Sequence, residues 1–67
     1  MEILINEQMY KLPIASCLDE VLNVLSLHEQ SGIAMAVNDV VVPKTEWARH
    51  KLTDKDKVLI IRAAQGG

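Results

Sequence analysis

The run Val58-Leu59-Ile60-Ile61, residues 58–61 of a 67-residue chain, decides the fold. Four consecutive apolar residues of high strand propensity are typical of a strand inside a sheet. The opening segment, residues 1–6, alternates instead, as a half-buried strand does. Its two faces carry Met1, Ile3 and Ile5 on one side, and Glu2, Leu4 and Asn6 on the other.

The rest of the chain alternates between strand signals, one helical repeat and turn residues. The helical repeat is Leu18, Val21, Leu22 and Leu25, preceded by Ser16 as an N-cap with Asp19 three residues on, and Gly32 is a later stop signal. The predicted elements are strands Met9–Leu12, Ile33–Asn38 and Val40–Val42, a helix Cys17–His28, a short helical turn within Lys44–His50, and a turn at Asp54-Lys55-Asp56.

One helix for one sheet predicts a two-layer α+β domain, with the helix across one face of the sheet. The connection Asn6-Glu7-Gln8 pairs the first two strands as a hairpin, so the last strand takes the free side of the first. The expected topology is a β-grasp with a mixed sheet of four to five strands. The domain is expected over residues 1–63, and residues 64–67 are expected to form a flexible tail.

Composition excludes several classes of protein. Apolar residues make up 49% of the chain, which indicates a folded core, and the net charge of -2 with no basic run argues against nucleic-acid binding. A single cysteine, Cys17, supplies neither a disulfide nor a zinc or iron–sulfur site. The sequence shows no signal peptide and no apolar stretch able to span a membrane, which predicts a cytoplasmic protein.

No residue pattern predicts catalysis by this chain alone. His28 and His50 lack further ligands at metal-binding spacing, and no catalytic triad or phosphate loop is present. Cys17 at a helix start could be a nucleophile, but a partly buried small apolar residue is the favoured interpretation. Trp47 could anchor a partner, although closing the end of the core is favoured. The protein is therefore predicted not to be an enzyme.

The most informative residues are the last two, Gly66 and Gly67. Glycines have no side chain, so a glycine pair can pass through a narrow channel and present a terminal carboxylate to another protein's active site. From Ala64 onward an extended tail reaches about 13 Å. This chemistry requires Gly67 to be the C-terminal residue. The carboxylate would need activation, for example as an acyl-adenylate, before sulfur or an amine could attack it.

Several motifs occur together in this chain: the MEILIN start, Val37-Asn38, the Val42-Pro43-Lys44 step followed by Trp47, the late apolar strand and the terminal Gly66-Gly67. On these motifs the chain resembles the ThiS family, the sulfur carrier proteins of thiamine biosynthesis, over essentially its whole length. One departure is Asp54-Lys55-Asp56, where the family usually has Asp-Gly-Asp. Lys55 raises the question of whether this turn needs a backbone angle that favours glycine.

The resemblance implies a ubiquitin-like β-grasp fold and a cycle of activation and sulfur transfer. A ThiF-like adenylating enzyme would use ATP and magnesium to adenylate the Gly67 carboxylate, with Gln65 and Gly66 threading its active site. A sulfur relay from a cysteine desulfurase would leave a thiocarboxylate, and thiazole synthase (ThiG) would accept the sulfur. The carrier itself would bind no cofactor.

Strand alternation predicts a surface for these partners. If Ile3, Ile5, Val58 and Ile60 face the helix, Leu4, Leu59 and Ile61 lie on the opposite face as an exposed apolar patch. Arg62, next along the chain, is assigned to the same partner-binding patch, and Gln65 is a second orienting contact beside the tail.

Three other functions remain open from the sequence. The small subunit of molybdopterin synthase shares the terminal Gly-Gly chemistry, although the short length and the segment from Pro43 to Trp47 favour the thiamine branch. A protein modifier would form an isopeptide bond through Gly67. A β-grasp interaction module with an inert tail would be unaffected by deletion of Gly66 and Gly67.

Overall fold

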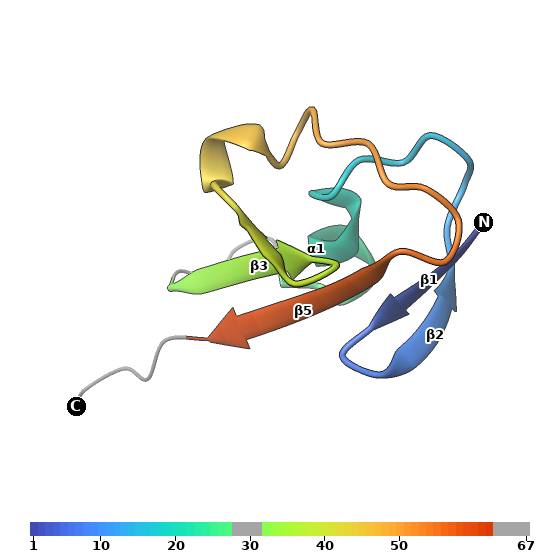
Figure 1. Ribbon diagram of the computed structural model, residues 1–67, viewed down its shortest axis with the longest axis horizontal. Helices are drawn as coiled ribbons and strands as arrows, with labels where there is room; N and C mark the ends of the chain where they lie inside the picture. The colour runs from blue at the N-terminus through green and yellow to red at the C-terminus, as the bar shows by residue number, and fades with distance from the viewer. Residues whose placement is uncertain (28–31, 63–67) are drawn as a thin grey trace.

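The computed structural model describes residues 1–27 and 32–62, and its five strands form one mixed sheet (Figure 1). The strands are β1 (Glu2–Ile5), β2 (Gln8–Lys11), β3 (Ile33–Val37), β4 (Val40–Val42) and β5 (Lys57–Arg62). Their order is β2-β1-β5-β3-β4. β5 runs parallel to β1 and antiparallel to β3, so the apolar run at residues 58–61 forms the central strand. The predicted position of the last strand is confirmed.

One face of the sheet packs against the helix α1 (Glu20–Val24) to form the core (Figure 1). Val21 and Leu22 of α1 are buried in one cluster with inward side chains from four strands, which are Ile3, Ile5, Met35, Val37, Val42, Val58 and Ile60. Burying one such side chain contributes about 1.5–3 kcal/mol. The predicted α+β class and the helix-facing residues of β1 and β5 are confirmed.

Two hairpins turn through pairs of residues with positive φ. Asn6 and Glu7 have φ of 46° and 71°, and Asn38 and Asp39 have φ of 49° and 72°. Two positive φ angles in a two-residue loop define a type I′ turn, whose twist matches the flanking strands. Asn and Asp tolerate this region better than most residues. Gln8, expected in the first connection, is instead the first residue of β2 and pairs with Ile5.

The asparagine of each turn also binds β5 through its side chain. The Asn6 Oδ1 accepts a hydrogen bond from the Ile60 N–H at 2.8 Å. The Asn38 Oδ1 accepts one from the Lys57 N–H at 3.0 Å, and its Nδ2 donates to the Asp56 carboxylate at 3.0 Å. The two hairpins are thus fastened to different ends of the central strand.

The helix begins three residues later than the sequence pattern predicts. The segment before it is held by an isolated bridge between Cys17 and Lys51, with the Leu18 N–H donating to the His50 carbonyl at 2.8 Å. Backbone groups that form hydrogen bonds across this bridge are not available for hydrogen bonds within a helix, so the helix begins after it. Ser16 is not the N-cap, because its hydroxyl donates to the Pro13 carbonyl at 2.7 Å. Asp19 occupies the N-cap position without a side-chain capping bond.

The helix also ends earlier than the predicted boundary at His28. Ser26 has φ of 57°, the Leu27 N–H donates to the Leu22 carbonyl at 2.7 Å, and the Ser26 N–H donates to the Asn23 carbonyl at 3.2 Å. These two bonds form a Schellman motif, which terminates a helix at a left-handed residue. His28 lies outside the described residues. No helix in residues 1–27 and 32–62 is long and apolar enough to cross a membrane.

Trp47 closes one end of the core, as predicted. It follows the short 3-10 helix η1 (Lys44–Glu46), is buried, and donates from its indole N–H to the Val42 carbonyl at 2.8 Å. This bond satisfies both polar groups while the ring contributes apolar area to the core cluster.

The turn before β5 answers the question that Lys55 raised. Lys55 has φ of 73°, so it lies in the region that glycine favours. Its N–H donates to the Glu2 carbonyl at 2.7 Å, and its ammonium contacts the Glu2 carboxylate. The hydrogen bond from the Lys55 ammonium to the Glu2 carboxylate, together with the charge of Lys55, holds the pKa of Glu2 below its ordinary value. The turn therefore keeps the glycine geometry and gains a surface ion pair with β1.

Candidate functional site

β5 leads the chain toward the residues that carry the predicted chemistry. In Figure 1 it points away from the N-terminus, and its last residue, Arg62, is the last one described. Gln65, Gly66 and Gly67 lie outside the described residues. The structure therefore defines the strand that precedes the tail and the surfaces on either side of that strand.

The face of the sheet opposite α1 exposes a group of large apolar side chains. We call this group the open-face patch; its members are Leu4, Met9, Val41, Leu59 and Ile61. Leu4 is partly buried, whereas the exposed fractions are 52% for Met9, 64% for Val41, 49% for Leu59 and 45% for Ile61. Contiguous exposed apolar side chains mark interaction surfaces more often than isolated ones do.

Strand register shows how the members of the patch are arranged across the sheet. Leu59 lies opposite Ala36 of β3, and Ala36 lies opposite Val41 of β4. On the other side of β5, Leu4 of β1 lies opposite Met9 of β2. Ala36 lies between Leu59 and Val41, and its small side chain rises less above the sheet than theirs do. Between these two parts, the β1–β5 register places Lys57 opposite Leu4, so the patch has one part on β4 and β5 and another on β1 and β2.

Two members of the patch, Met9 and Val41, were not identified from the sequence. Met9 shares the face of Leu4 because the two residues are cross-strand partners, and Val41 shares the face of Ala36 for the same reason. The signal was present in the hairpins, since a two-residue turn fixes the register of both strands. Counting outward from Asn6-Glu7 and Asn38-Asp39 gives both pairs.

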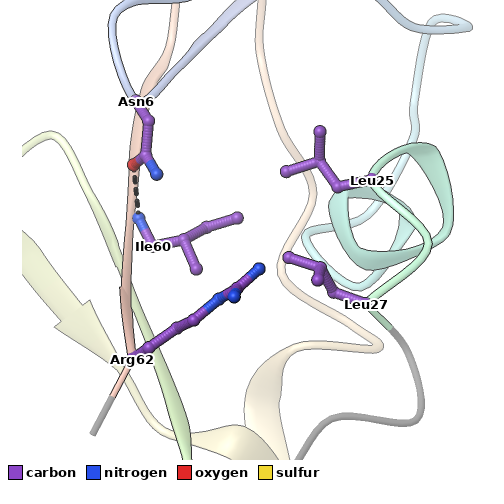
Figure 2. Close-up of a pocket in the computed structure, with 5 residues that line it drawn as sticks. All are labelled: Asn6, Leu25, Leu27, Ile60 and Arg62. Atoms are coloured by element: carbon purple, nitrogen blue, oxygen red, sulfur yellow. Dashed lines mark hydrogen bonds between the residues drawn. The ribbon is translucent and has the colours of Figure 1, made fainter. Parts of the chain in front are cut away.

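Arg62 does not lie with the other predicted patch residues. Strand alternation turns it to the helix side, where it faces Leu25 and Leu27 and lines a pocket of about 430 Å³ together with Asn6 and Ile60 (Figure 2). The predicted four-residue patch is therefore divided, with Leu4, Leu59 and Ile61 on the open face and Arg62 on the covered one. The sequence prediction grouped Arg62 with the patch by its nearness to the tail, whereas parity on the strand puts it on the other face; its role in partner binding stays a prediction.

The turn at Asp56 fixes where β5 begins. The Asp56 carboxylate accepts from the Thr53 N–H at 2.8 Å, the Thr53 hydroxyl at 2.9 Å and the Asn38 amide at 3.0 Å. Partial burial raises the pKa of Asp56, but these hydrogen bonds outweigh that effect, so its pKa lies below the ordinary value. The negative carboxylate thus joins the turn to the β3–β4 hairpin.

The remaining sequence candidates do not assemble into a second site in the part of the chain that is described. Cys17 is half-buried beside Lys51, and its thiol stays without an assigned role. Within residues 1–27 and 32–62, no group of three or more His, Cys, Asp or Glu side chains could hold a metal ion. His28 lies outside the described residues.

Comparisons with known proteins agree with this geometry. The model of the ThiS family matches residues 3–67. The sulfur carrier protein ThiS of Escherichia coli strain K12 is 34% identical, over the whole length of both chains. A crystal structure of the thiamine biosynthesis protein ThiS from Geobacter metallireducens superposes with a TM-score of 0.83, at 17% identity and complete coverage of both chains, which supports the fold. The chain belongs to the ThiS family.

Proposed function

We propose that this protein carries sulfur as a thiocarboxylate on Gly67 for the thiazole ring of thiamine. As a member of the ThiS family it is a sulfur carrier protein of thiamine biosynthesis, a protein cosubstrate and not a catalyst. The observation that carries the proposal is the reach of the family match, which runs to residue 67 and so includes Gly66-Gly67. The proposal requires Gly67 to be C-terminal.

The proposed chemistry starts with activation of the Gly67 carboxylate. Bound to a ThiF-like adenylating enzyme, a carboxylate oxygen attacks the α-phosphorus of ATP, and magnesium-bound pyrophosphate leaves. The terminal sulfur of a persulfide, supplied by a cysteine desulfurase, then attacks the acyl carbon and AMP leaves. A second thiol attacks the cysteine sulfur of the resulting acyl disulfide, so that a disulfide forms between the two thiols and the thiocarboxylate leaves. Thiazole synthase of the ThiG type takes the sulfur. We propose that this cycle runs in the cytoplasm, where ATP is available.

The division between tail and domain separates chemistry from recognition. Gln65 and Gly66 are proposed to occupy the channel of the adenylating enzyme, where the missing side chain of Gly66 permits close approach of the backbone. A tail this short buries little surface. Most of the binding energy must therefore come from the folded domain.

The open-face patch is the proposed docking surface of the adenylating enzyme. It includes Leu59 and Ile61 of β5, the strand that leads into the tail, so a protein bound there lies next to the tail. Hot spots in protein interfaces are well-packed, desolvated side chains near the centre of the contact. Ile61, closest to the tail among the patch residues, is expected to be one.

The intact mass of the protein tests the chemistry. The chain is incubated with ATP, magnesium, a ThiF-like adenylating enzyme, a cysteine desulfurase and cysteine, beside a variant that lacks Gly67. The expected result is a mass increase equal to replacement of one oxygen by sulfur, absent from the truncated variant. No change, with the enzyme shown to be active on its own carrier, would contradict the proposal. A conjugate to a lysine of another protein would indicate a modifier.

A charge placed in the patch tests the docking surface. Ile61→Asp is expected to raise the KM of the adenylating enzyme for the carrier about tenfold or more, the effect of losing one hot-spot side chain. Val40→Asp is the matched control, because Val40 is an exposed β-branched strand residue outside the patch. Unchanged adenylation of Ile61→Asp would exclude the patch as the docking surface.

A further inference from the structure

We propose that Asn6 is a positioning residue, whose side-chain carboxamide holds the C-terminal half of β5 in line and so sets the direction in which the chain leaves toward Gly67. The inference deepens the proposed function and rests on it. It concerns a residue of the β1–β2 turn that is distant in sequence from the tail.

The first observation is that β1 is too short for β5. The two parallel strands pair only at Leu4 with Lys57 and at Ile5 with Val58, whereas β5 continues to Arg62. At Asn6 the backbone enters the turn, with φ of 46°. The last backbone group that this side offers is the Asn6 N–H, which donates to the Val58 carbonyl at 3.0 Å.

The second observation is that the Asn6 side chain extends this edge by one step. Its Oδ1 accepts from the Ile60 N–H at 2.8 Å, in the position where a further β1 residue would have offered its carbonyl (Figure 2). The contact is partly buried beside the pocket that Ile60 and Arg62 line. Asn6 thus binds β5 on one side, while β3 pairs with it on the other side, where Met35 lies opposite Ile60 in the register.

The bond matters because the end of a strand frays when one edge is unpaired. Losing one hydrogen bond of ordinary strength shifts the balance between the held and frayed forms about fivefold. If a partner binds only molecules in which β5 is held, its apparent affinity is reduced in proportion to the fraction of molecules in that form. Once the tail is inside the partner, the bound state is the same with or without Asn6. The expected effect is therefore on KM and not on kcat.

The chain contains a matched comparison in Asn38. It occupies the same position of the same turn type, and its Oδ1 accepts from a β5 N–H in the same way. Its contact is to Lys57, at the end of β5 that is remote from the tail, and it makes an additional bond to Asp56. If Asn6 acted only through overall stability, replacing Asn38 would be at least as harmful.

Three variants separate these roles. Asn6→Gly keeps a residue suited to positive φ and removes the carboxamide, while Asn6→Asp keeps an acceptor oxygen at the same position. Asn38→Gly is the control. In the free protein, amide exchange at Ile60 is expected to speed up about fivefold in Asn6→Gly and to stay near the original rate in the other two. An unchanged rate in Asn6→Gly would overturn the inference.

The functional readout is ATP–pyrophosphate exchange by a ThiF-like adenylating enzyme at varied carrier concentration. Asn6→Gly is expected to raise the KM for the carrier by up to about fivefold, the limit reached when the frayed form predominates, and to leave kcat within about twofold, whereas Asn6→Asp restores the KM. Asn38→Gly leaves both constants within about twofold. A normal KM for Asn6→Gly, with its Ile60 amide exposed, overturns the inference alone. Absence of exchange with every carrier, the unmodified one included, overturns the proposed function as well.

Discussion

Ile60 and Ile61 are neighbouring isoleucines on the same strand, yet their side chains lie on opposite faces of the sheet. Ile60 packs under α1 in the core cluster and is 9% exposed, while Ile61 is 45% exposed on the open face. The comparison shows that alternate residues of one apolar run differ in burial, since Ile60 stabilises the fold and Ile61 stays exposed on the open face. A half-exposed apolar side chain adds little to stability, which agrees with the docking surface proposed above.

The largest expected effect comes from truncating each isoleucine in turn. Ile60→Ala should reduce the free energy of unfolding by about 2–4 kcal/mol, because it removes buried methylene groups and leaves a cavity under α1. Ile61→Ala should cost less than about 1 kcal/mol, because its side chain is already half in water. Urea denaturation at pH 7, followed by tryptophan fluorescence, measures both values.

The two variants should exchange rank in binding. At a temperature where both are folded, Ile61→Ala is expected to weaken adenylation more than Ile60→Ala does, because only Ile61 lies on the proposed docking surface. Equal losses of stability from the two substitutions would contradict the division of the sheet into a covered and an open face.

A smaller effect is expected at Trp47, which closes the end of the covered face. Trp47→Phe keeps an aromatic ring but removes the donor to the Val42 carbonyl, at a cost of about 0.5–1.5 kcal/mol for one hydrogen bond. Tyr10→Phe is the control, because the Tyr10 hydroxyl donates only to the exposed Gln8 side chain in the described structure. Denaturant midpoints of the two variants are compared, and equal midpoints would argue against a buried indole bond.

The division into faces could be predicted from the sequence because it depends on a period of two. Ile3, Ile5, Val58 and Ile60 were assigned to the helix side, and their burial confirms it. Arg62 has the parity of Ile60 and lies on the helix side, apart from the other predicted patch residues, and its role in partner binding stays a prediction. The Asn6 contact to Ile60 could not be predicted, since it joins residues 54 positions apart through a side chain.

Low pH is expected to destabilise the protein through groups at the rim of the sheet, where the titrating carboxylates lie, and not through its covered face. Hydrogen bonds lower the pKa of Asp56 in the folded state, so its contribution is complete above the unfolded-state value of about 3.9 and is lost as pH falls through the folded value. The pKa of Glu2 is lowered by its hydrogen bond to Lys55, so protonation of Glu2 also reduces stability as the pH falls. Stability should therefore fall below about pH 4.

Two substitutions check that assignment. Asp56→Asn should lower stability by roughly 1 kcal/mol at pH 7, allowing for screening by solvent, and should flatten the acid limb. Asp39→Asn should leave the loss of stability in acid unchanged, because the Asp39 side chain is exposed and its Oδ1 lies 3.9 Å from the Nζ of Lys57. The measurement is the urea midpoint between pH 7 and pH 2.5. An acid limb as steep in Asp56→Asn as in the unmodified chain would assign it to other carboxylates.

The helix that covers the core is the element that the sequence predicted least well. The apolar repeat Leu18, Val21, Leu22 and Leu25 is real, and all four residues are buried or pack against the core. Only part of it is helical, because the repeat reports which side chains face inward and not which backbone bonds are made. The bridge at Cys17 and the left-handed Ser26 limit the helix, and both depend on tertiary contacts or a single φ angle.

The smallest predicted effect is the one that best separates the two descriptions of this helix. With Ser26 in the left-handed C′ position, Ser26→Gly removes the strain of a side chain at positive φ and should stabilise the protein by about 0.5 kcal/mol. If the helix continued through Ser26 toward His28, as its repeat suggested, glycine in a helix interior would destabilise by a similar amount instead. Ser26→Ala should be neutral or slightly destabilising in the first case and stabilising in the second. The signs of the two changes in denaturant midpoint, and not their size, thus decide where the helix that covers the sheet ends.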